Sequence, residues 1–166
     1  MSIYIGIDPG KKGAISGIFN NEQIVSAMMS TESLIKHQLC SIARWYDFTP
    51  TREPRFGYIG EEPVKAIIEA VHAFPGQGVT SMFTFGQNYG FLRGCLVALG
   101  ISFMEVTPQK WMAYFGLKKN KEEAGTDYKK RILQKAQNLF PNSNVTLQTA
   151  DSLMLAEYLR RTDGKP

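Results

Sequence analysis

The sequence IYIGIDPG at residues 3–10, followed by GAISGIF at residues 13–19, decides the fold. It predicts an apolar strand, a tight glycine-rich turn and a second strand. Asp8 lies inside the first apolar run, and an aspartate is costly to bury unless it is paired or binds a metal. Two interpretations of Asp8 therefore stand at this point. It begins the turn by hydrogen-bonding the backbone beyond it, or it is a ligand in a buried site.

The chain opens on three predicted strands, at residues 3–8, 13–19 and 23–29. Their connectors have only four and three residues. Neighbouring strands must then be antiparallel, because a parallel crossover needs about a dozen residues or more. Helical and strand patterns alternate along the rest of the chain and predict an α/β fold. The further strands are predicted at residues 57–60, 65–71 and 101–106. The further helices are predicted at residues 31–46 and 80–99, from Pro108, and at residues 150–159, where Thr149 can cap the last one.

Three glycines, Gly86, Gly90 and Gly94, recur every four residues in the predicted helix at 80–99, which Thr80 or Ser81 can cap. Each glycine costs about 1 kcal/mol relative to alanine in a helix, so a packing or functional reason is expected. The spacing predicts a helix face that a neighbouring backbone approaches very closely.

Length and composition set the class of protein. The chain has 166 residues, which predicts one domain over residues 1–166. It contains no apolar run long enough to span a bilayer and no secretory leader, so we expect a soluble, cytoplasmic protein without membrane partners. The net charge of +4 permits a nucleic-acid partner.

A second carboxylate, Glu69, lies inside the apolar run at residues 65–71. Glu61 and Glu62 are the competing acids, but they stand between a glycine and a proline and are interpreted as solvated turn residues. A third, Asp151, falls in the first turn of the last predicted helix, where the helix dipole stabilises an ionised carboxylate. Its plain interpretation is a helix-start acid.

Together, Asp8, Glu69 and Asp151 suggest one site, because hard oxygen ligands suit Mg²⁺. Two such ions about 3.5–4 Å apart can support phosphodiester cleavage. His37 and His72 are isolated, so no zinc spacing is present. The phosphate-binding Walker pattern and the serine-nucleophile elbow are also absent, and no nucleotide cofactor is expected.

Positive charge gathers between residues 118 and 135. The plain interpretation is a solvated helix face, and the alternative is a surface that contacts phosphates. The seven basic residues there are Lys118, Lys119, Lys121, Lys129, Lys130, Arg131 and Lys135.

Four motifs carry a resemblance to a known family. They are GIDPG at residues 6–10, IEAVHAFPGQGVTSMF at 68–83, VTPQKW at 106–111 and ADSLMLAEY at 150–158. In this order, and spread over nearly the whole chain, they resemble the phage-type branch of the RuvC family of Holliday-junction resolvases.

The resemblance implies an RNase H-like fold, with a mixed five-stranded sheet whose first three strands are antiparallel and which helices flank. It also implies a homodimer with two active sites. Such a dimer cuts symmetrically opposed strands of a four-way DNA junction with Mg²⁺ or Mn²⁺. A phage-encoded member would act in the host cytoplasm.

Site residues follow from the same resemblance. Asp8, Glu69 and Asp151 carry over as metal ligands and catalytic acids, and Lys110 is the candidate cation near the scissile phosphate. The family usually has a fourth acid a few residues before the last one. This chain has TLQT at residues 146–149, and Gln148 is the candidate replacement through its side-chain carbonyl oxygen.

Contacts to DNA are predicted for four further side chains. Lys118, Lys119 and Lys121 are candidate phosphate contacts, and Phe74 is a candidate wedge that stacks on an unpaired base. The alternative for Phe74 is a core position. The glycines around Asp8, Gly6 and Gly10, are expected to leave room for a metal and a phosphate.

Two other functions compete with a nuclease. A non-cleaving junction-binding protein would explain the missing fourth acid. An actin-like or sugar-kinase ATPase also begins with a strand and a glycine-rich turn, but it needs two such domains, and 166 residues are too few for both.

Overall fold

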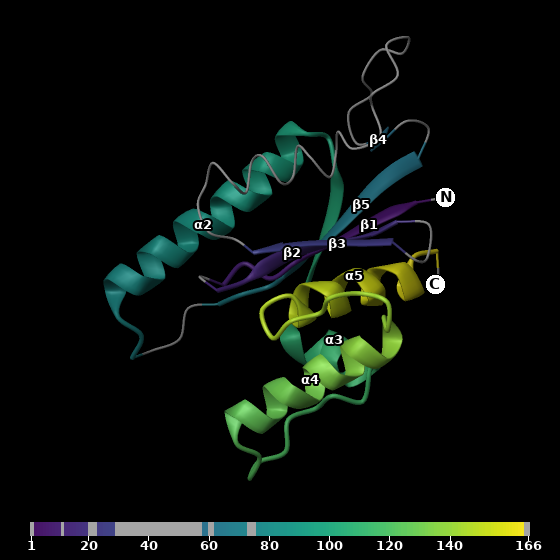
Figure 1. Ribbon diagram of the computed structural model, residues 1–166. Coiled ribbons are helices and arrows are strands. Elements are labelled where there is room, and N and C mark those ends of the chain that lie inside the picture. The colour runs from purple at the N-terminus through teal and green to yellow at the C-terminus, as the bar shows by residue number, and fades with distance from the viewer. Residues whose placement is uncertain are drawn as a thin grey trace.

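The computed structural model describes residues 2–10, 12–19, 23–28, 58–59, 62–72 and 76–164. A central sheet separates helix α2 (Val79–Ala98) on one face from α5 (Ala150–Thr162) on the other (Figure 1). Helices α3 (Pro108–Tyr114) and α4 (Gly125–Leu139) lie on the α5 side. The predicted helix at residues 31–46 and the candidate wedge Phe74 lie outside the described residues.

The sheet is mixed. Antiparallel pairing joins β3 to β2 and β2 to β1, whereas β1 pairs in parallel with β5, and β5 in parallel with β6. The short β4 pairs antiparallel with the beginning of β5, so β4 and β6 share one edge of that strand. The prediction of a mixed α/β sheet that starts with antiparallel strands and is flanked by helices is therefore confirmed. The strands are β1 (Ile3–Ile7), β2 (Ala14–Phe19), β3 (Gln23–Met28), β4 (Tyr58–Ile59), β5 (Glu62–Glu69) and β6 (Ser102–Val106).

Alternation along β1 and β5 assigns each side chain to one face, because the side-chain period of a strand is two. Ile5 and Ile7 of β1 belong to the apolar cluster under α2, together with Ile68 of β5. Ile67 belongs to the opposite cluster, under α5. Glu69, two residues beyond Ile67, is thereby directed to the α5 side.

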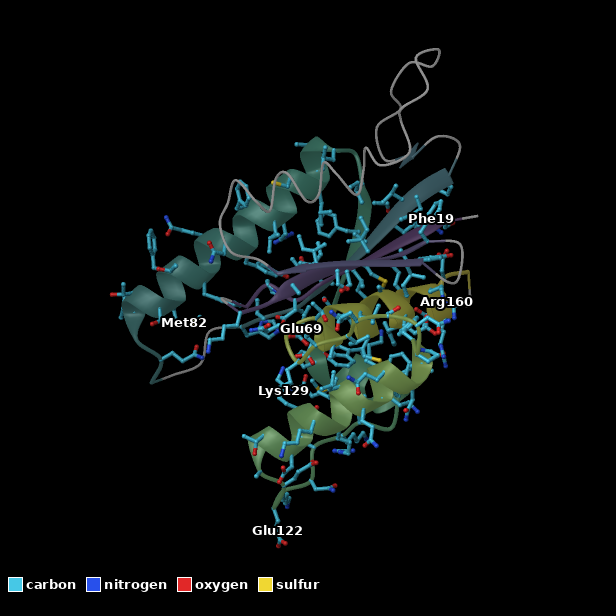
Figure 2. All side chains as sticks on the ribbon, viewed as in Figure 1. Phe19, Glu69, Met82, Glu122, Lys129 and Arg160 are labelled. Carbon is cyan, nitrogen blue, oxygen red and sulfur yellow. The ribbon has the colours of Figure 1, made fainter. Side chains whose placement is uncertain are left out.

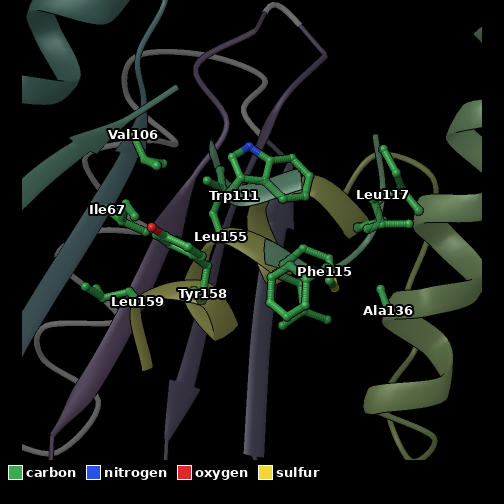
Figure 3. Close-up of a cluster of buried hydrophobic side chains, with 14 of the residues drawn as sticks. Ile67, Val106, Trp111, Phe115, Leu117, Ala136, Leu155, Tyr158 and Leu159 are labelled. Atoms are coloured by element: carbon green, nitrogen blue, oxygen red, sulfur yellow. The ribbon is translucent and has the colours of Figure 1, made fainter. Parts of the chain in front are cut away.

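The cluster under α5 is the larger of the two. Ten consecutive residues of α5, from Ala150 to Leu159, are buried. Figure 3 shows Trp111 from α3 close to Leu155 and Tyr158 of α5, with Ile67 of the sheet beside them. Helix α5 is thus a central element of this core, and its position is fixed along its length.

Gly6 sets how closely α5 approaches the sheet. A Cβ atom at Gly6 would lie 2.0 Å from the carbonyl oxygen of Ser152 and 2.4 Å from the backbone nitrogen of Ala156. The hydroxyls of Ser152 and Ser16 are hydrogen-bonded at 2.7 Å beside this contact. The expectation that Gly6 leaves room for a metal and a phosphate is therefore wrong, because the backbone of α5 takes that space.

Two local predictions are corrected. Glu62 is the first residue of β5, because its pairing with Ile59 extends the strand where a turn was expected. Helix α2 begins one residue earlier than expected, with Gly78 at its N-cap in place of Thr80 or Ser81.

The glycine face of α2 differs from its prediction as well. A Cβ atom at Gly86, Gly90 or Gly94 would meet no described atom within 4 Å. Within the described part of this chain, that face is open. None of the described helices combines the length and the apolar character needed to cross a membrane.

Candidate carboxylate site

Asp8 and Glu69 lie at the same end of the sheet, where the parallel strands β1 and β5 finish. Strands β1 and β5 are parallel neighbours, and their register places Ile7 opposite Ile68. The next residues, Asp8 and Glu69, therefore follow adjacent strands, and adjacent strands lie about 4.8 Å apart in a sheet. Their separation is set by backbone hydrogen bonding, and each side chain follows a fully buried isoleucine.

Asp8 has the first of the two roles that the sequence left open, and its role as a ligand stays a prediction. Its carboxylate Oδ1 accepts a hydrogen bond from the backbone N–H of Gly10 at 3.1 Å, so it does hold the turn. Burial raises its pKa above the ordinary value, and the charge of Asp151 raises the pKa further. The Gly10 hydrogen bond and the charge of Lys129 oppose this shift. Asp8 is thus a turn former whose charge faces other acids.

The pKa of Glu69 is strongly shifted. Burial raises the pKa of Glu69 to about 7, and the charges of Asp8 and Asp151 add to this effect. The indole N–H of Trp111 donates a hydrogen bond to Glu69 Oε1 at 2.8 Å and favours the ionised form. A carboxyl group with this pKa changes its charge near neutral pH.

Asp151 is supplied by helix α5, which packs on the sheet. It stands in the first turn of α5 and is only 7% exposed. Its Oδ2 accepts a hydrogen bond from the ammonium of Lys129, which extends from α4. Its Oδ1 is buried without a hydrogen-bond partner among the described residues.

The charges of these acids thus act on one another, and their assignment to one ligand site stays a prediction. Two functional neighbours were missed. Lys129 appeared only as one of seven basic residues, although its place beside the buried Tyr128 on a helix was a usable signal. Trp111 was passed over for its neighbour Lys110, although a tryptophan in an apolar helix usually finds a partner for its N–H.

The acids fit a divalent cation in chemistry. Carboxylate oxygens are the ligands that Mg²⁺ and Mn²⁺ prefer, and the unpartnered Oδ1 of Asp151 is a buried acceptor with free capacity. The cage is not preassembled: within the described residues, no three His, Cys, Asp or Glu side chains are already gathered into a metal-binding group.

The other predicted site residues lie farther out. Lys110 is exposed on α3, and Gln148 is exposed in the turn before α5. No described contact joins either of them to the carboxylates, and their assignment as site residues stays a prediction.

Six of the seven residues of the basic segment fall into two groups. Three of its members are paired with acids: Lys129 with Asp151, Lys130 with Asp127, and Arg131 with Glu123. Lys118, Lys119 and Lys121 are exposed in the segment between α3 and α4. Arg131 also donates to the backbone carbonyl of Lys118 at 2.8 Å and ties this segment to α4. Phosphate contacts by these three lysines stay a prediction.

No protein-family model matches the chain, and no curated protein matches it in sequence. Two solved structures are similar to it over nearly its full length. RuvC of Thermus thermophilus in complex with Holliday junction substrate has 11% sequence identity, with 99% of this chain and 98% of that chain covered and a TM-score of 0.60. A second Thermus thermophilus RuvC structure has 10% identity, 96% coverage of both chains and a TM-score of 0.57. This likeness confirms the RuvC-like fold.

Proposed function

We propose that this chain is a structure-specific endodeoxyribonuclease that resolves four-way and related branched DNA junctions by metal-dependent hydrolysis. One observation carries the proposal. Asp8, Glu69 and Asp151 come from two parallel strands and a helix and interact at one sheet edge, within a fold similar to that of RuvC. Acids whose pKa values are raised by burial and by neighbouring carboxylates, as those of Asp8 and Glu69 are, are typical of functional sites.

Mg²⁺ or Mn²⁺ would be held by Asp8, Glu69 and Asp151. When bound, such an ion supplies Lewis-acid stabilisation of the charge that develops on the phosphate. Hydrolysis adds water across the phosphorus–oxygen bond, with the hydroxyl going to phosphorus and a proton to the leaving oxygen. Glu69 keeps its orientation through the hydrogen bond from Trp111, and Asp8 keeps its orientation through that from Gly10.

DNA would approach from the side on which the exposed lysines lie. Lys118, Lys119 and Lys121 suit phosphate contacts.

The test compares labelled four-way junctions, flaps and linear duplexes in Mg²⁺ or Mn²⁺. Wild type should cut the junction and leave the duplex intact. Glu69→Gln should abolish cutting. Glu62→Gln is the matched control, because it removes the same charge from the other end of the same strand, and it should cut normally.

Two results would overturn the proposal. If wild type binds the junction tightly and yields no product in Mn²⁺, the chain is a junction-binding protein without nuclease activity. If Glu62→Gln abolishes cutting and Glu69→Gln does not, the proposed site is wrong.

We further propose that the active form is a homodimer that pairs through α2. An exposed stripe of small and apolar residues runs along the helix face that points away from the sheet. Val79 is 85% exposed, Phe83 66% and Val97 68%, and no described atom of this chain would meet a side chain added at the glycines between them. The stripe comprises Val79, Phe83, Gly86, Gly90, Gly94 and Val97.

Glycines at this spacing let two helix backbones approach closely, and a two-fold pairing of one patch with itself produces a closed dimer. Such a dimer would bring two carboxylate sites to one junction. Light scattering should give twice the chain mass for wild type and the chain mass for Gly90→Glu, which places a charge in the middle of the stripe. A dimer that survives Gly90→Glu would rule out this face.

A further inference from the structure

The segment between α3 and α4 carries three exposed lysines and begins at a buried residue. Leu117, directly before it, is 3% exposed within the core under α5. The N–H of Leu117 donates a hydrogen bond to the carbonyl of Met112 at 2.8 Å, which fixes this end of the segment to α3. We call residues 118–123 the lysine segment. Its lysines are Lys118, Lys119 and Lys121.

One ion pair joins the lysine segment to the middle of α4. The guanidinium of Arg131 donates to both carboxylate oxygens of Glu123, from Nε at 3.0 Å and from Nη2 at 2.8 Å. The same Nη2 donates to the backbone carbonyl of Lys118 at 2.8 Å. Glu123 also accepts a hydrogen bond from the backbone N–H of Asn120 at 3.2 Å. The beginning, middle and end of the segment are therefore all tied to one guanidinium–carboxylate pair.

The surroundings of Arg131 hold this pair in one geometry. Its guanidinium lies over the ring of the buried Tyr128, 5.5 Å from the ring centroid, in a favourable cation–π arrangement. The side chain of Glu123 is 14% exposed, whereas those of the Lys130–Asp127 pair on the same helix are 71% and 63% exposed. A bidentate fork between arginine and a carboxylate has a defined orientation, which a lysine pair lacks. The Glu123–Arg131 pair is therefore suited to fixing the backbone of the segment.

A second acid stands directly before Glu123 and has different surroundings. Glu122 is exposed, and Figure 2 shows it extending outward at the tip of the segment, beyond α4 and away from Glu69. Within the described part of the chain, Glu122 forms no hydrogen bond or ion pair. Each of the two acids brings one negative charge close to the lysines, and negative charge repels DNA phosphates. Charge alone therefore predicts tighter DNA binding when either acid is removed.

We propose that the Glu123–Arg131 pair is a positioning clamp, which holds the lysine segment in the arrangement that contacts DNA phosphates away from the carboxylate site. This inference rests on the proposed function for its DNA ligand. A loop that is already ordered loses less conformational entropy when it binds, so its contacts contribute more to affinity. At Glu123 this gain outweighs the repulsion between one carboxylate and the phosphates. Order and charge thus make opposite predictions at Glu123 and the same prediction at Glu122.

The first measurement uses the full chain without DNA. Glu123→Ala and Glu122→Ala are matched variants, because they have the same composition and the same net charge. Hydrogen exchange over residues 118–123 should become faster in Glu123→Ala and stay at the wild-type rate in Glu122→Ala. Arg131→Lys keeps the positive charge but loses the bidentate fork, so it should exchange as fast as Glu123→Ala. Wild-type exchange rates in Glu123→Ala would show that there is no clamp.

The second measurement is binding to a labelled four-way junction in EDTA, which prevents metal-dependent cleavage. Glu123→Ala and Arg131→Lys should each bind about tenfold more weakly than wild type, because the segment must be ordered at the moment of binding. The plot of log affinity against log salt should also become shallower, by about one phosphate contact, in both variants. Glu122→Ala should bind as tightly as wild type or slightly more tightly, with no loss of slope.

Tighter junction binding by Glu123→Ala, equal to that of Glu122→Ala, would overturn the inference, since charge would then explain both variants. A wild type that binds the junction and yields no product in Mn²⁺ would end the nuclease proposal, and the clamp would still be decided by the binding comparison. A wild type that binds no junction would refute the phosphate contact together with the proposed function.

Discussion

The two ends of helix α5 have opposite electrostatics. At its carboxyl end, Asp163 accepts hydrogen bonds from Lys65 at 2.6 Å and from Tyr4 at 3.0 Å. The hydrogen bonds from both partners lower the pKa of Asp163, and the one from Lys65 has the larger effect. At its amino end, Asp151 meets two further acids, and the pKa values of both Asp8 and Glu69 are raised. Helix α5 therefore has an acid that is neutralised by its partners at the carboxyl end and acids that repel one another at the amino end.

Glu157 shows how this fold treats an acid that has only a structural role. It is 2% exposed, and burial alone would raise its pKa. Hydrogen bonds from Arg160 and Arg161 outweigh burial and lower the pKa below its ordinary value. The carboxyl-end acids thus have dedicated cations, whereas three acids at the amino end share Lys129. Incompletely neutralised clusters of this kind are typical of functional sites.

The largest difference between the two ends should appear on removing one carboxylate from each. Asp8→Asn should lower junction cleavage by about 1,000-fold or more, since the loss of a ligand removes several kcal/mol of charge stabilisation. Asp163→Asn should leave cleavage near wild type and lower the free energy of unfolding by about 1 kcal/mol at most, as is usual for a partly exposed pair. Cleavage rates and urea unfolding measure the two effects. Equal loss of cleavage in both variants would contradict the division of roles.

The close contact at Gly6 should connect the two ends. Gly6→Ala places a methyl group against the backbone of Ser152 and Ala156 and should cost about 1–3 kcal/mol of unfolding free energy through overpacking. It should also weaken Mn²⁺ binding, because α5 must shift and Asp151 moves with it. Gly125→Ala is the control, since nothing lies within 4 Å of that position, and its stability should stay the same or rise slightly.

A smaller effect is expected at the hydrogen bond that orients Glu69. Trp111→Phe removes the indole donor, so the pKa of Glu69 should rise further and Mn²⁺ affinity should fall by about 10–100-fold. Calorimetry at several pH values would show the affinity curve moving to higher pH. Phe115→Leu, which removes apolar volume from the same cluster, should leave that curve in place. An unchanged curve in Trp111→Phe would mean that the hydrogen bond has no part in ligand binding.

The smallest predicted effect is a pair of opposite pH dependences in the metal-free protein. Glu69 has a folded-state pKa of about 7 against an ordinary 4.5, so its contribution to stability is present below pH 4.5 and is lost as pH rises through 7. Asp163 has a lowered pKa, so its contribution is present at neutral pH and is lost in acid. The unfolding free energy of Glu69→Gln minus that of wild type should therefore be larger at pH 8 than at pH 5. Asp163→Asn should be most destabilised near neutral pH. Unfolding curves at these pH values would measure both, and parallel pH profiles in the two variants would refute the assignment.

The three acids could be found from the sequence because each breaks or begins a local pattern. Glu69 interrupts an apolar strand, and Asp8 ends one. Asp151 stands at a helix start. Patterns of this kind depend on a few consecutive residues, and the predicted strands of the opening meander were confirmed for the same reason.

The parts that could not be predicted depend on contacts between distant segments. Lys129 and Lys130 are identical in type and adjacent in sequence, and only the packing of α4 decides which of them reaches Asp151. The residues that pack against Gly6 lie near the other end of the chain. The sequence therefore suggested that Gly6 leaves room for a metal, whereas it leaves room for the backbone of α5. Glu62 was placed in a turn because its neighbours suggested one, although pairing with β4 extends the strand.

The pairing of Ile7 with Ile68 has a consequence for how far this sequence can diverge. Main-chain hydrogen bonds, which every amino acid except proline can make, fix the distance between the first two acids. Substitutions among the apolar residues that precede Asp8 and Glu69 can therefore accumulate while the spacing of the acids persists, provided that the alternation of the two faces is kept. A site built in this way can be inherited through lineages whose sequences no longer align.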